Sequence, residues 1–129
     1  MSVDAKEKGI MLLSTTTLDV TSTGQTTLYT VPTGKRMVPH CAVVVCGSAA
    51  STTATLTFGQ VGALTDFLGT QTMTNLAAQY DAVTCIPVPN ATPVKTKSYA
   101  ATTVFQVDVS TADVDGMTDG TVYLFGFLY

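Results

Sequence analysis

A chain of 129 residues, of which 46% are hydrophobic and only 12% are charged, predicts one domain with a sizeable core. The net charge is −3 and the six Lys and Arg residues are dispersed, which argues against a surface that follows nucleic-acid phosphates. No apolar run is long enough to span a bilayer, so we expect neither a nucleic acid nor a membrane as partner.

The first residues predict an arm ahead of the folded domain. Residues 1–8 are polar and of mixed charge, and the apolar residues 10–13 are too few for the core of a signal peptide. We expect an N-terminal arm over residues 1–13, a single β-sandwich domain over residues 14–129, and synthesis in a cytoplasm. The residues of the arm that we expect to dock on a partner are Ile10, Met11, Leu12 and Leu13.

Two apolar, β-branched runs flank a turn signal near residue 33. Pro32 presets the φ angle of a turn, and Gly34 can adopt the positive φ that closes it. The pattern predicts a β-hairpin that joins strands over residues 26–31 and 35–46. Pro39 cannot donate a hydrogen bond to a neighbouring strand, so we expect a bulge or an edge position there.

Residues 53–59 show the clearest strand periodicity. Ala54, Leu56 and Phe58 alternate with threonines, which predicts an apolar inner face and a hydroxyl-bearing face toward solvent. Such a row of hydroxyls also occurs on ice-binding or sugar-binding faces, and that alternative stays open.

The period then changes. Met73, Leu76, Ala77 and Tyr80 are spaced as on one face of a helix, and Thr72 is a candidate N-cap. This spacing predicts a short helix on the connection between two strands.

Further strands are predicted over residues 82–88, 95–100, 104–109 and 121–129, with an acidic loop over residues 111–120. About eight strands at intervals of roughly ten residues predict an all-β fold, a two-sheet antiparallel jelly-roll-like sandwich with an extended N-terminal arm. The last strand is apolar on both faces and needs cover. Its aromatic residues, which we expect in the core or at a subunit seam, are Tyr123, Phe125, Phe127 and Tyr129.

Residues for catalysis are scarce. His40 is the only histidine and Glu7 the only glutamate, and no nucleophile or phosphate-binding motif is present. Cys41, Cys46 and Cys85 have neither disulfide-framework nor zinc spacing, so we expect small buried side chains. The sequence predicts a protein that is not an enzyme and has no cofactor.

The acidic loop holds the only candidate metal ligands, Asp113, Asp115 and Asp119. Carboxylates on a glycine-containing loop suit Ca²⁺, but the spacing departs from that of an EF-hand, and a solvated loop has the same composition. The basic residues at 35–36 and at 95 and 97 either face an acidic patch of a neighbouring subunit or keep strand edges from pairing.

Residues 28–35, Leu-Tyr-Thr-Val-Pro-Thr-Gly-Lys, resemble an "LYTVPxGK" hairpin of small tailed-phage virion proteins. In those proteins the hairpin opens a β-sandwich and precedes a long Val-rich strand, which residues 37–46 match here. The resemblance covers only part of the chain and carries no catalytic residue. Proteins of this kind include jelly-roll capsid decoration (cement) proteins, commonly trimeric, and tail or receptor-binding modules.

The resemblance therefore implies a phage structural protein that decorates the head and stabilises it by adhesion to neighbouring capsid subunits. Its expected partners are the major capsid protein and other copies of itself in a homotrimer, and its expected location is the capsid surface of the virion after synthesis in the host cytoplasm. The alternative is a tail or fibre module that recognises a cell-surface glycan through aromatic residues and carboxylates on loops, at residues 80–81 or 113–119.

Overall fold

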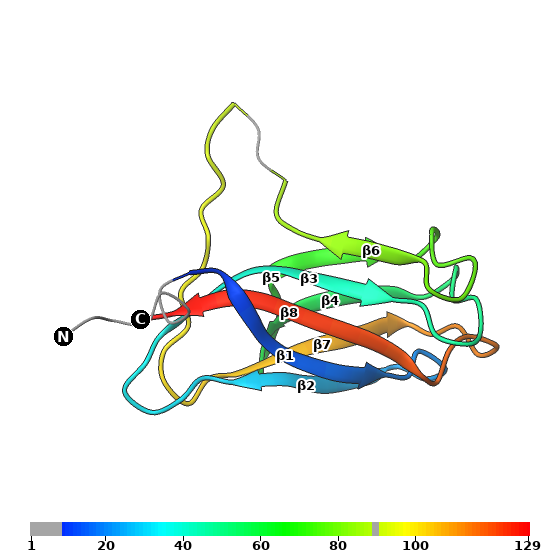
Figure 1. The fold of residues 1–129 in the computed structure, drawn as a ribbon, viewed down its shortest axis with the longest axis horizontal. Coiled ribbons are helices and arrows are strands. Elements are labelled where there is room, and N and C mark those ends of the chain that lie inside the picture. The colour runs from blue at the N-terminus through cyan, green and yellow to red at the C-terminus, as the bar shows by residue number, and fades with distance from the viewer. Residues whose placement is uncertain (1–8, 89–90) are drawn as a thin grey trace.

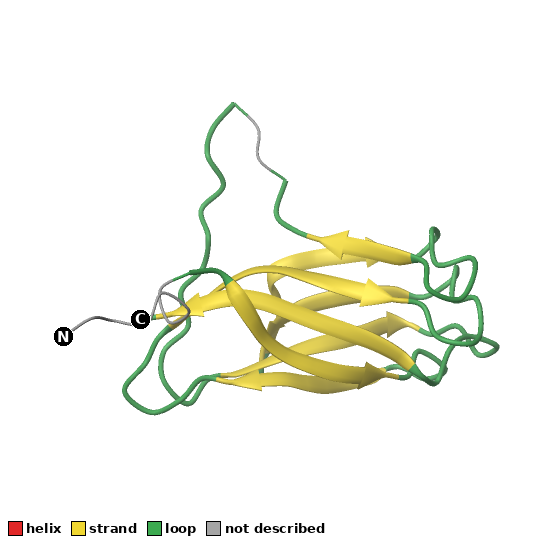
Figure 2. Cartoon of the chain, in the orientation of Figure 1, coloured by secondary structure: helices red, strands yellow, loops and turns green. Residues whose placement is uncertain are grey.

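The computed structural model of this chain describes residues 9–88 and 91–129. These residues form strands and loops, with no helix among them (Figure 2). Eight strands are labelled in Figure 1. Their bounds are β1 Met11–Leu18, β2 Gly24–Thr30, β3 Met37–Val45, β4 Thr55–Gln60, β5 Ala63–Thr72, β6 Ala82–Cys85, β7 Val104–Thr111 and β8 Gly120–Leu128.

The strands form two antiparallel sheets of four strands each. The first sheet has the order β1-β8-β3-β6, and the second sheet has the order β2-β7-β4-β5. Every connection except the one between β4 and β5 passes from one sheet to the other, which is the winding of a jelly roll. The prediction of an all-β, two-sheet jelly-roll-like sandwich is confirmed.

The core lies between the sheets and takes alternate residues from each strand, because successive side chains of a strand point to opposite faces. Leu124 is fully buried, whereas the next residue, Phe125, is half-buried on the outer face. Phe105 packs edge-on against Phe67 and Tyr99, with ring centroids 5.6 and 5.4 Å apart. Burial of one such side chain stabilises the fold by about 1.5–3 kcal/mol.

The hairpin predicted around Pro32 is wrong, although its turn is present. Gly34 has φ +79°, and the Lys35 N–H donates to the Pro32 carbonyl at 3.2 Å. The flanking strands β2 and β3 nevertheless belong to different sheets. The same turn chemistry therefore serves a crossing between sheets, and β2 pairs with β7, whose sequence lies far along the chain.

The helix predicted over residues 73–80 is also wrong, since these residues form turns. Met73 and Leu76 are buried at the end of the sandwich, and this burial accounts for their spacing. Tyr80 has φ +74°, which no α-helix contains. The Asp81 carboxylate accepts hydrogen bonds from the Ala77 and Ala78 N–H groups at 3.2 and 2.9 Å, which holds the turns in place of helical bonds.

The strand predicted over residues 95–100 is reduced to one bridge. Tyr99 exchanges two backbone hydrogen bonds with Met37, at 2.9 and 2.8 Å. Residues 86–88 and 91–98 instead form a projecting loop that leaves the sandwich beyond the edge strand β6 (Figure 1).

The bulge predicted in β3 is confirmed, and the expected burial of the cysteines is confirmed for Cys46 and Cys85 but not for Cys41. The register of β3 against β8 shifts between Pro39 and Cys41, so a bulge lies at the proline. Cys41 is half-buried on the outer side of the strand, and Cys46 is buried in the core, so the two thiols lie on opposite faces. Cys85 is buried as well, and all three cysteines are free.

The strand β4 agrees with its periodicity on one face only. Ala54, Leu56 and Phe58 are buried as predicted. Thr57, which we expected in a solvent-facing row, is only 3% exposed, and its hydroxyl has no hydrogen-bond partner among the described residues. The expectation of an open hydroxyl face is therefore wrong at this residue, which lies opposite Asp108 of β7.

The described part of the predicted arm does not stand apart from the domain. Residues 11–13 belong to β1, which pairs with β8, and Leu13 packs against the core. Ile10 precedes the strand and is 57% exposed. The remainder of the predicted arm, residues 1–8, lies outside the described residues.

Candidate docking surface

The first sheet has no charged residue in any of its four strands, as the printed sequence shows. Its outer side chains are aromatic, aliphatic or sulfur-containing rather than polar, except for the threonines at one end and His40 at the bulge. We call this surface the apolar face. Its members are Leu12 of β1, Val38, Cys41, Val43 and Val45 of β3, and Tyr123, Phe125 and Phe127 of β8.

The register places the aromatic residues of β8 along the middle of the apolar face. Phe125 lies between Leu12 on one side and Cys41 on the other. Tyr123 lies beside Val43, two residues further along. Leu12 is 49% exposed. Its neighbours on this face are half-buried because they cover one another, and they are Cys41, Val43, Tyr123 and Phe125.

The second sheet presents a polar outer face instead. The Gln25 side-chain amide donates to Asp108 at 2.8 Å, across the pair β2 and β7. The hydroxyls of Thr55 and Ser110 lie 2.7 Å apart, across the pair β4 and β7. A face whose polar groups bond to one another in solvent needs no partner, whereas the apolar face leaves hydrophobic area exposed to water.

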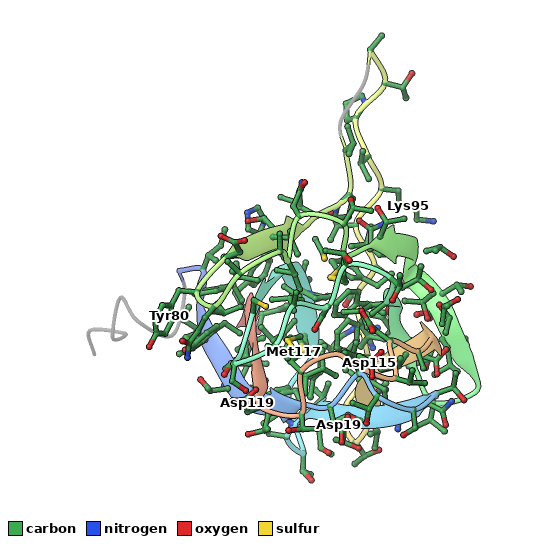
Figure 3. All side chains as sticks on the ribbon, turned by 90° about the vertical axis from the view of Figure 1, so that its right-hand side faces the viewer. Asp19, Tyr80, Lys95, Asp115, Met117 and Asp119 are labelled. Carbon is green, nitrogen blue, oxygen red and sulfur yellow. The ribbon has the colours of Figure 1, made fainter. Side chains whose placement is uncertain are left out.

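Five carboxylates lie at the end of the sandwich that Figure 3 shows facing the viewer. They come from the loops that follow β1, β5 and β7, and the sequence of these loops contains no Lys or Arg. We call this region the acidic end. Its carboxylates are Asp19, Asp81, Asp113, Asp115 and Asp119.

The candidate metal ligands of the acidic loop serve different backbone groups. Asp113 accepts a hydrogen bond from the Thr53 N–H at 3.3 Å, and Asp119 accepts one from the Ser48 N–H at 2.9 Å. These hydrogen bonds lower the pKa of both carboxyl groups. Within residues 9–88 and 91–129, no group of three acidic, His or Cys side chains is placed to hold a metal ion.

The opposite end of the sandwich is basic. Lys35 and Arg36 lie there, on the loop before β3, whereas Lys95 and Lys97 lie on the projecting loop before β7; neither loop contains an acidic residue among those described. Arg36 donates to the Ser98 hydroxyl at 3.0 Å and to the Ser98 carbonyl at 3.2 Å. We call this region the basic end.

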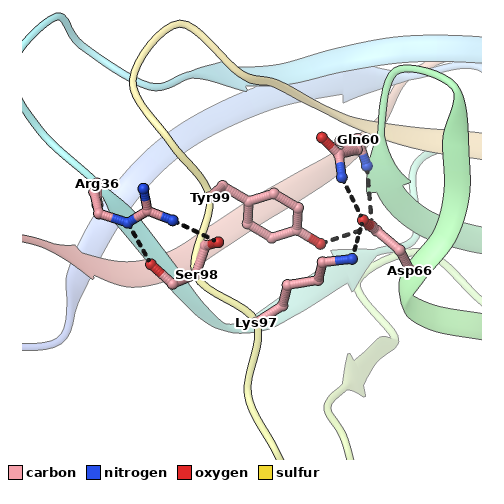
Figure 4. Close-up of polar contacts among 6 residues, drawn as sticks. All are labelled: Arg36, Gln60, Asp66, Lys97, Ser98 and Tyr99. Carbon is pink, nitrogen blue, oxygen red and sulfur yellow. Dashed lines mark hydrogen bonds and ion pairs between the residues drawn. The ribbon is translucent and has the colours of Figure 1, made fainter.

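Asp66 of β5 anchors the base of the projecting loop (Figure 4). Its carboxylate accepts the Tyr99 hydroxyl at 2.7 Å, the Lys97 ammonium at 2.9 Å and the side-chain amide of Gln60 at 2.7 Å. Burial raises the pKa of Asp66, but these hydrogen bonds together outweigh it, so that the pKa is lowered. Burial and this carboxylate raise the pKa of Tyr99 far above its usual range.

Tyr129 lies at the basic end and is 59% exposed, so it is not covered by the core. Its hydroxyl lies 2.9 Å from the Ser98 hydroxyl, and its ring lies 6.2 Å from that of Phe127. The hydrogen bond with Ser98 and the nearby Arg36 lower the pKa of this tyrosine.

His40 is exposed beside the bulge and lines a hollow at the base of the projecting loop, with Pro39, Ile86 and Val94 among its neighbours. The thiols nearby are poor nucleophiles, since burial raises the pKa of Cys41 and, with the nearby Cys41 thiol, raises that of Cys85 to about 11.

Of the predicted docking residues, the structure brings Leu12, Tyr123, Phe125 and Phe127 together on one face, and it places Ile10 and Tyr129 at the basic end. Met11 is half-buried in β1. Sequence reasoning missed the contribution of β3 to this face and the separation of charge between the two ends. Both depend on which strands are neighbours, and the local pattern does not contain that information.

In three comparisons with known proteins, no protein-family model, no curated protein and no solved structure matches this chain. Among the described residues there is also no helix with the length and hydrophobicity needed to cross a membrane.

Proposed function

We propose that this protein is a structural component of a tailed-phage virion that decorates the head and stabilises it by adhesion. The observation that carries the proposal is the apolar face, an uncharged outer sheet surface that suits burial against protein. The resemblance of residues 28–35 to a hairpin of phage virion proteins, and the jelly-roll winding around it, add support. The geometry suits contact rather than catalysis, and the role proposed is not enzymatic.

The partners in this role are the major capsid protein and further copies of the same chain, on the outer surface of the head. Ile10 is 57% exposed at the basic end, next to the edge of the apolar face, and is placed to reach a neighbouring protein. Repetition over a capsid lattice makes weak individual contacts collectively strong.

The glycan-binding alternative receives less support from the loops on which it depends. Tyr80 is 77% exposed, but its neighbour Asp81 is engaged by two backbone N–H groups. Asp113 and Asp119 are engaged in the same way. One oxygen of each of these carboxylates is already bonded to backbone N–H groups, which leaves fewer acceptors for the hydroxyls of a sugar.

The test is whether the protein fractionates with heads or with tails, and whether it rebinds to heads prepared without it. We expect it on intact heads, with occupancy reduced several-fold by Ile10→Asp, because a carboxylate in a buried apolar contact is costly. Val114→Asp is the matched control, since Val114 is 76% exposed at the opposite end. Recovery with tails alone, or equal occupancy of the two variants, would contradict the proposal.

A further inference from the structure

Charged residues bracket the apolar face at both ends of its strands. Asp19 directly follows β1, Asp81 directly precedes β6, and Asp119 directly precedes β8. At the other end, Arg36 directly precedes β3, with Lys35 beside it. The sheet is therefore an uncharged strip between a row of carboxylates and a pair of cations.

The net charge of −3 hides this separation. Of the charged residues that the structure describes, five carboxylates lie at the acidic end, Lys35 and Arg36 lie at the opposite end, and Lys95 and Lys97 lie on the projecting loop. Of the carboxylates in the described part of the chain, only Asp66 and Asp108 lie outside the acidic end, and each is already bonded, to Lys97 and to Gln25. The molecule thus has opposite charges at its two ends, with an apolar surface between them.

We propose that the apolar face binds a second copy of this chain, with the two sheets face to face and their long axes antiparallel. A two-fold axis in the plane of contact and perpendicular to the strands places each acidic end beside the partner's basic end. Such an interface is self-complementary, so the favourable contact between ends is made twice. Opposite charges attract and like charges repel over about 10 Å at moderate salt, which selects this orientation.

Parallel arrangements lose this advantage. A two-fold axis along the strands would bring the acidic ends of both copies together. The homotrimer that the resemblance implies would do the same if its axis ran along the strands, and three sets of carboxylates would then be neighbours. Among closed assemblies that bury the apolar face, the antiparallel pair is the one that the charges favour.

None of the segments that the structure describes lies across the apolar face. The projecting loop leaves beyond the β6 edge, as both views show, and it does not cross the outer face of the sheet (Figures 1 and 3). Two packed sheets lie about 10 Å apart, with side chains interdigitated. A sheet of this size offers on the order of 500 Å² per copy, less than a standard interface, so we expect a dimer of micromolar rather than nanomolar affinity.

The inference assigns the apolar face to one of the two partners proposed above, a second copy of the chain, and it leaves Ile10 and the ends of the sandwich for contact with the capsid. A dimer in solution can form whether or not the protein binds heads, so the two proposals fail separately. Loss of the dimer with head binding intact would remove this inference alone. A dimer that fractionates with no particle would remove the proposed function alone.

The first test measures the mass of the purified protein in solution by sedimentation equilibrium. We expect a monomer–dimer equilibrium that weakens as salt rises from about 0.05 to 0.5 M. Phe125→Lys, at the centre of the apolar face, should weaken the dimer by about a hundredfold, because it buries an unpaired charge. Gln106→Lys is the matched control on the outer face of the second sheet, and it should leave the dimer unchanged.

The second test determines the orientation. Lys35→Glu and Asp115→Lys each reverse one exposed charge at opposite ends, and each should weaken its own dimer by roughly three- to tenfold. An equimolar mixture of the two variants should recover association, since the new glutamate faces the new lysine in an antiparallel pair. Alkylation of Cys41 should slow on dimerisation, because this thiol belongs to the apolar face.

A monomer at all concentrations, or a trimer, would overturn the proposal. Equal effects of Phe125→Lys and Gln106→Lys would place the interface elsewhere. A mixture that associates no better than either charge variant alone would rule out the antiparallel orientation. Circular dichroism of every variant separates loss of association from loss of folding.

Discussion

The two sheets share one core, but their outer faces differ in how they meet water. The outer face of the second sheet carries pairs such as Gln25 with Asp108, which bond to each other in solvent. The outer face of the first sheet carries Tyr123, Phe125 and Phe127, which have hydrophobic area and few polar atoms. The comparison teaches that the inner faces form the core in both sheets, so the outer faces can differ in polarity without changing the fold.

The largest effect on the free energy of unfolding should come from comparing substitutions at two adjacent residues of β8, one on each face of the first sheet. Leu124→Ala removes a fully buried side chain and should lower the free energy of unfolding by about 2–5 kcal/mol. Phe125→Ala should cost only about 1 kcal/mol in the monomer, because its ring is half-buried. Urea unfolding at low protein concentration measures both, and equal costs would mean that Phe125 belongs to the core.

A smaller effect should appear on the second sheet at Asp66. Asp66→Asn weakens the hydrogen bonds with Tyr99 and Lys97 and should cost about 2 kcal/mol. The pKa of Asp66 is lowered from 3.8, so its contribution is present above that pH and is lost as the pH falls toward the folded-state pKa. The variant should lack this part of the acid dependence.

Asp115→Asn is the control for Asp66→Asn, since Asp115 is exposed on a loop. It should leave the unfolding free energy unchanged near neutral pH. An unfolding free energy for Asp66→Asn equal to that of the wild type would show that the loop base is held by its packing alone.

The smallest effect concerns a polar atom on the second sheet that lacks a partner. Thr57→Val removes a buried hydroxyl with no bond among the described residues and should stabilise the fold by about 0.5–1 kcal/mol. Thr55→Val is the matched change two residues earlier on the same face of β4. The Thr55 hydroxyl bonds to Ser110, so this change should destabilise the fold slightly. Thermal unfolding of both variants tests the sign, and destabilisation by Thr57→Val would contradict the assignment.

The sequence predicts most of the strands but not their partners, and it misses β5, which lies in the stretch expected to be a connection. Alternation is a local property, so the inward set Ala54, Leu56 and Phe58 could be read directly. Strand neighbours are set by the whole fold, so the turn at Pro32 could not reveal that β2 and β3 lie in different sheets. Met73 and Leu76 show the same limit, because burial at the end of a sandwich can imitate the spacing of a helix.

The sequence predicts that part of the apolar face that comes from a single strand. The aromatic residues of β8 predict a surface that needs cover, because Phe125 and Phe127 are two residues apart and so lie on the same face of a strand. Their neighbours Cys41 and Val43 come from β3 and join them only through the register of the sheet. The acidic and basic ends likewise arise from the alternating direction of the strands, which gathers alternate loops at each end.

The central position of β8 has a consequence for the order of events during synthesis. This strand is the last of the eight along the chain, yet it joins β1 to β3 within the first sheet. Until the ribosome has released β8, the strands before it cannot complete that sheet, and the aromatic strip of the apolar face does not exist. In that interval the edges of β1 and β3 that later pair with β8 have no partner, so the nascent chain is exposed to non-native strand pairing until β8 is in place.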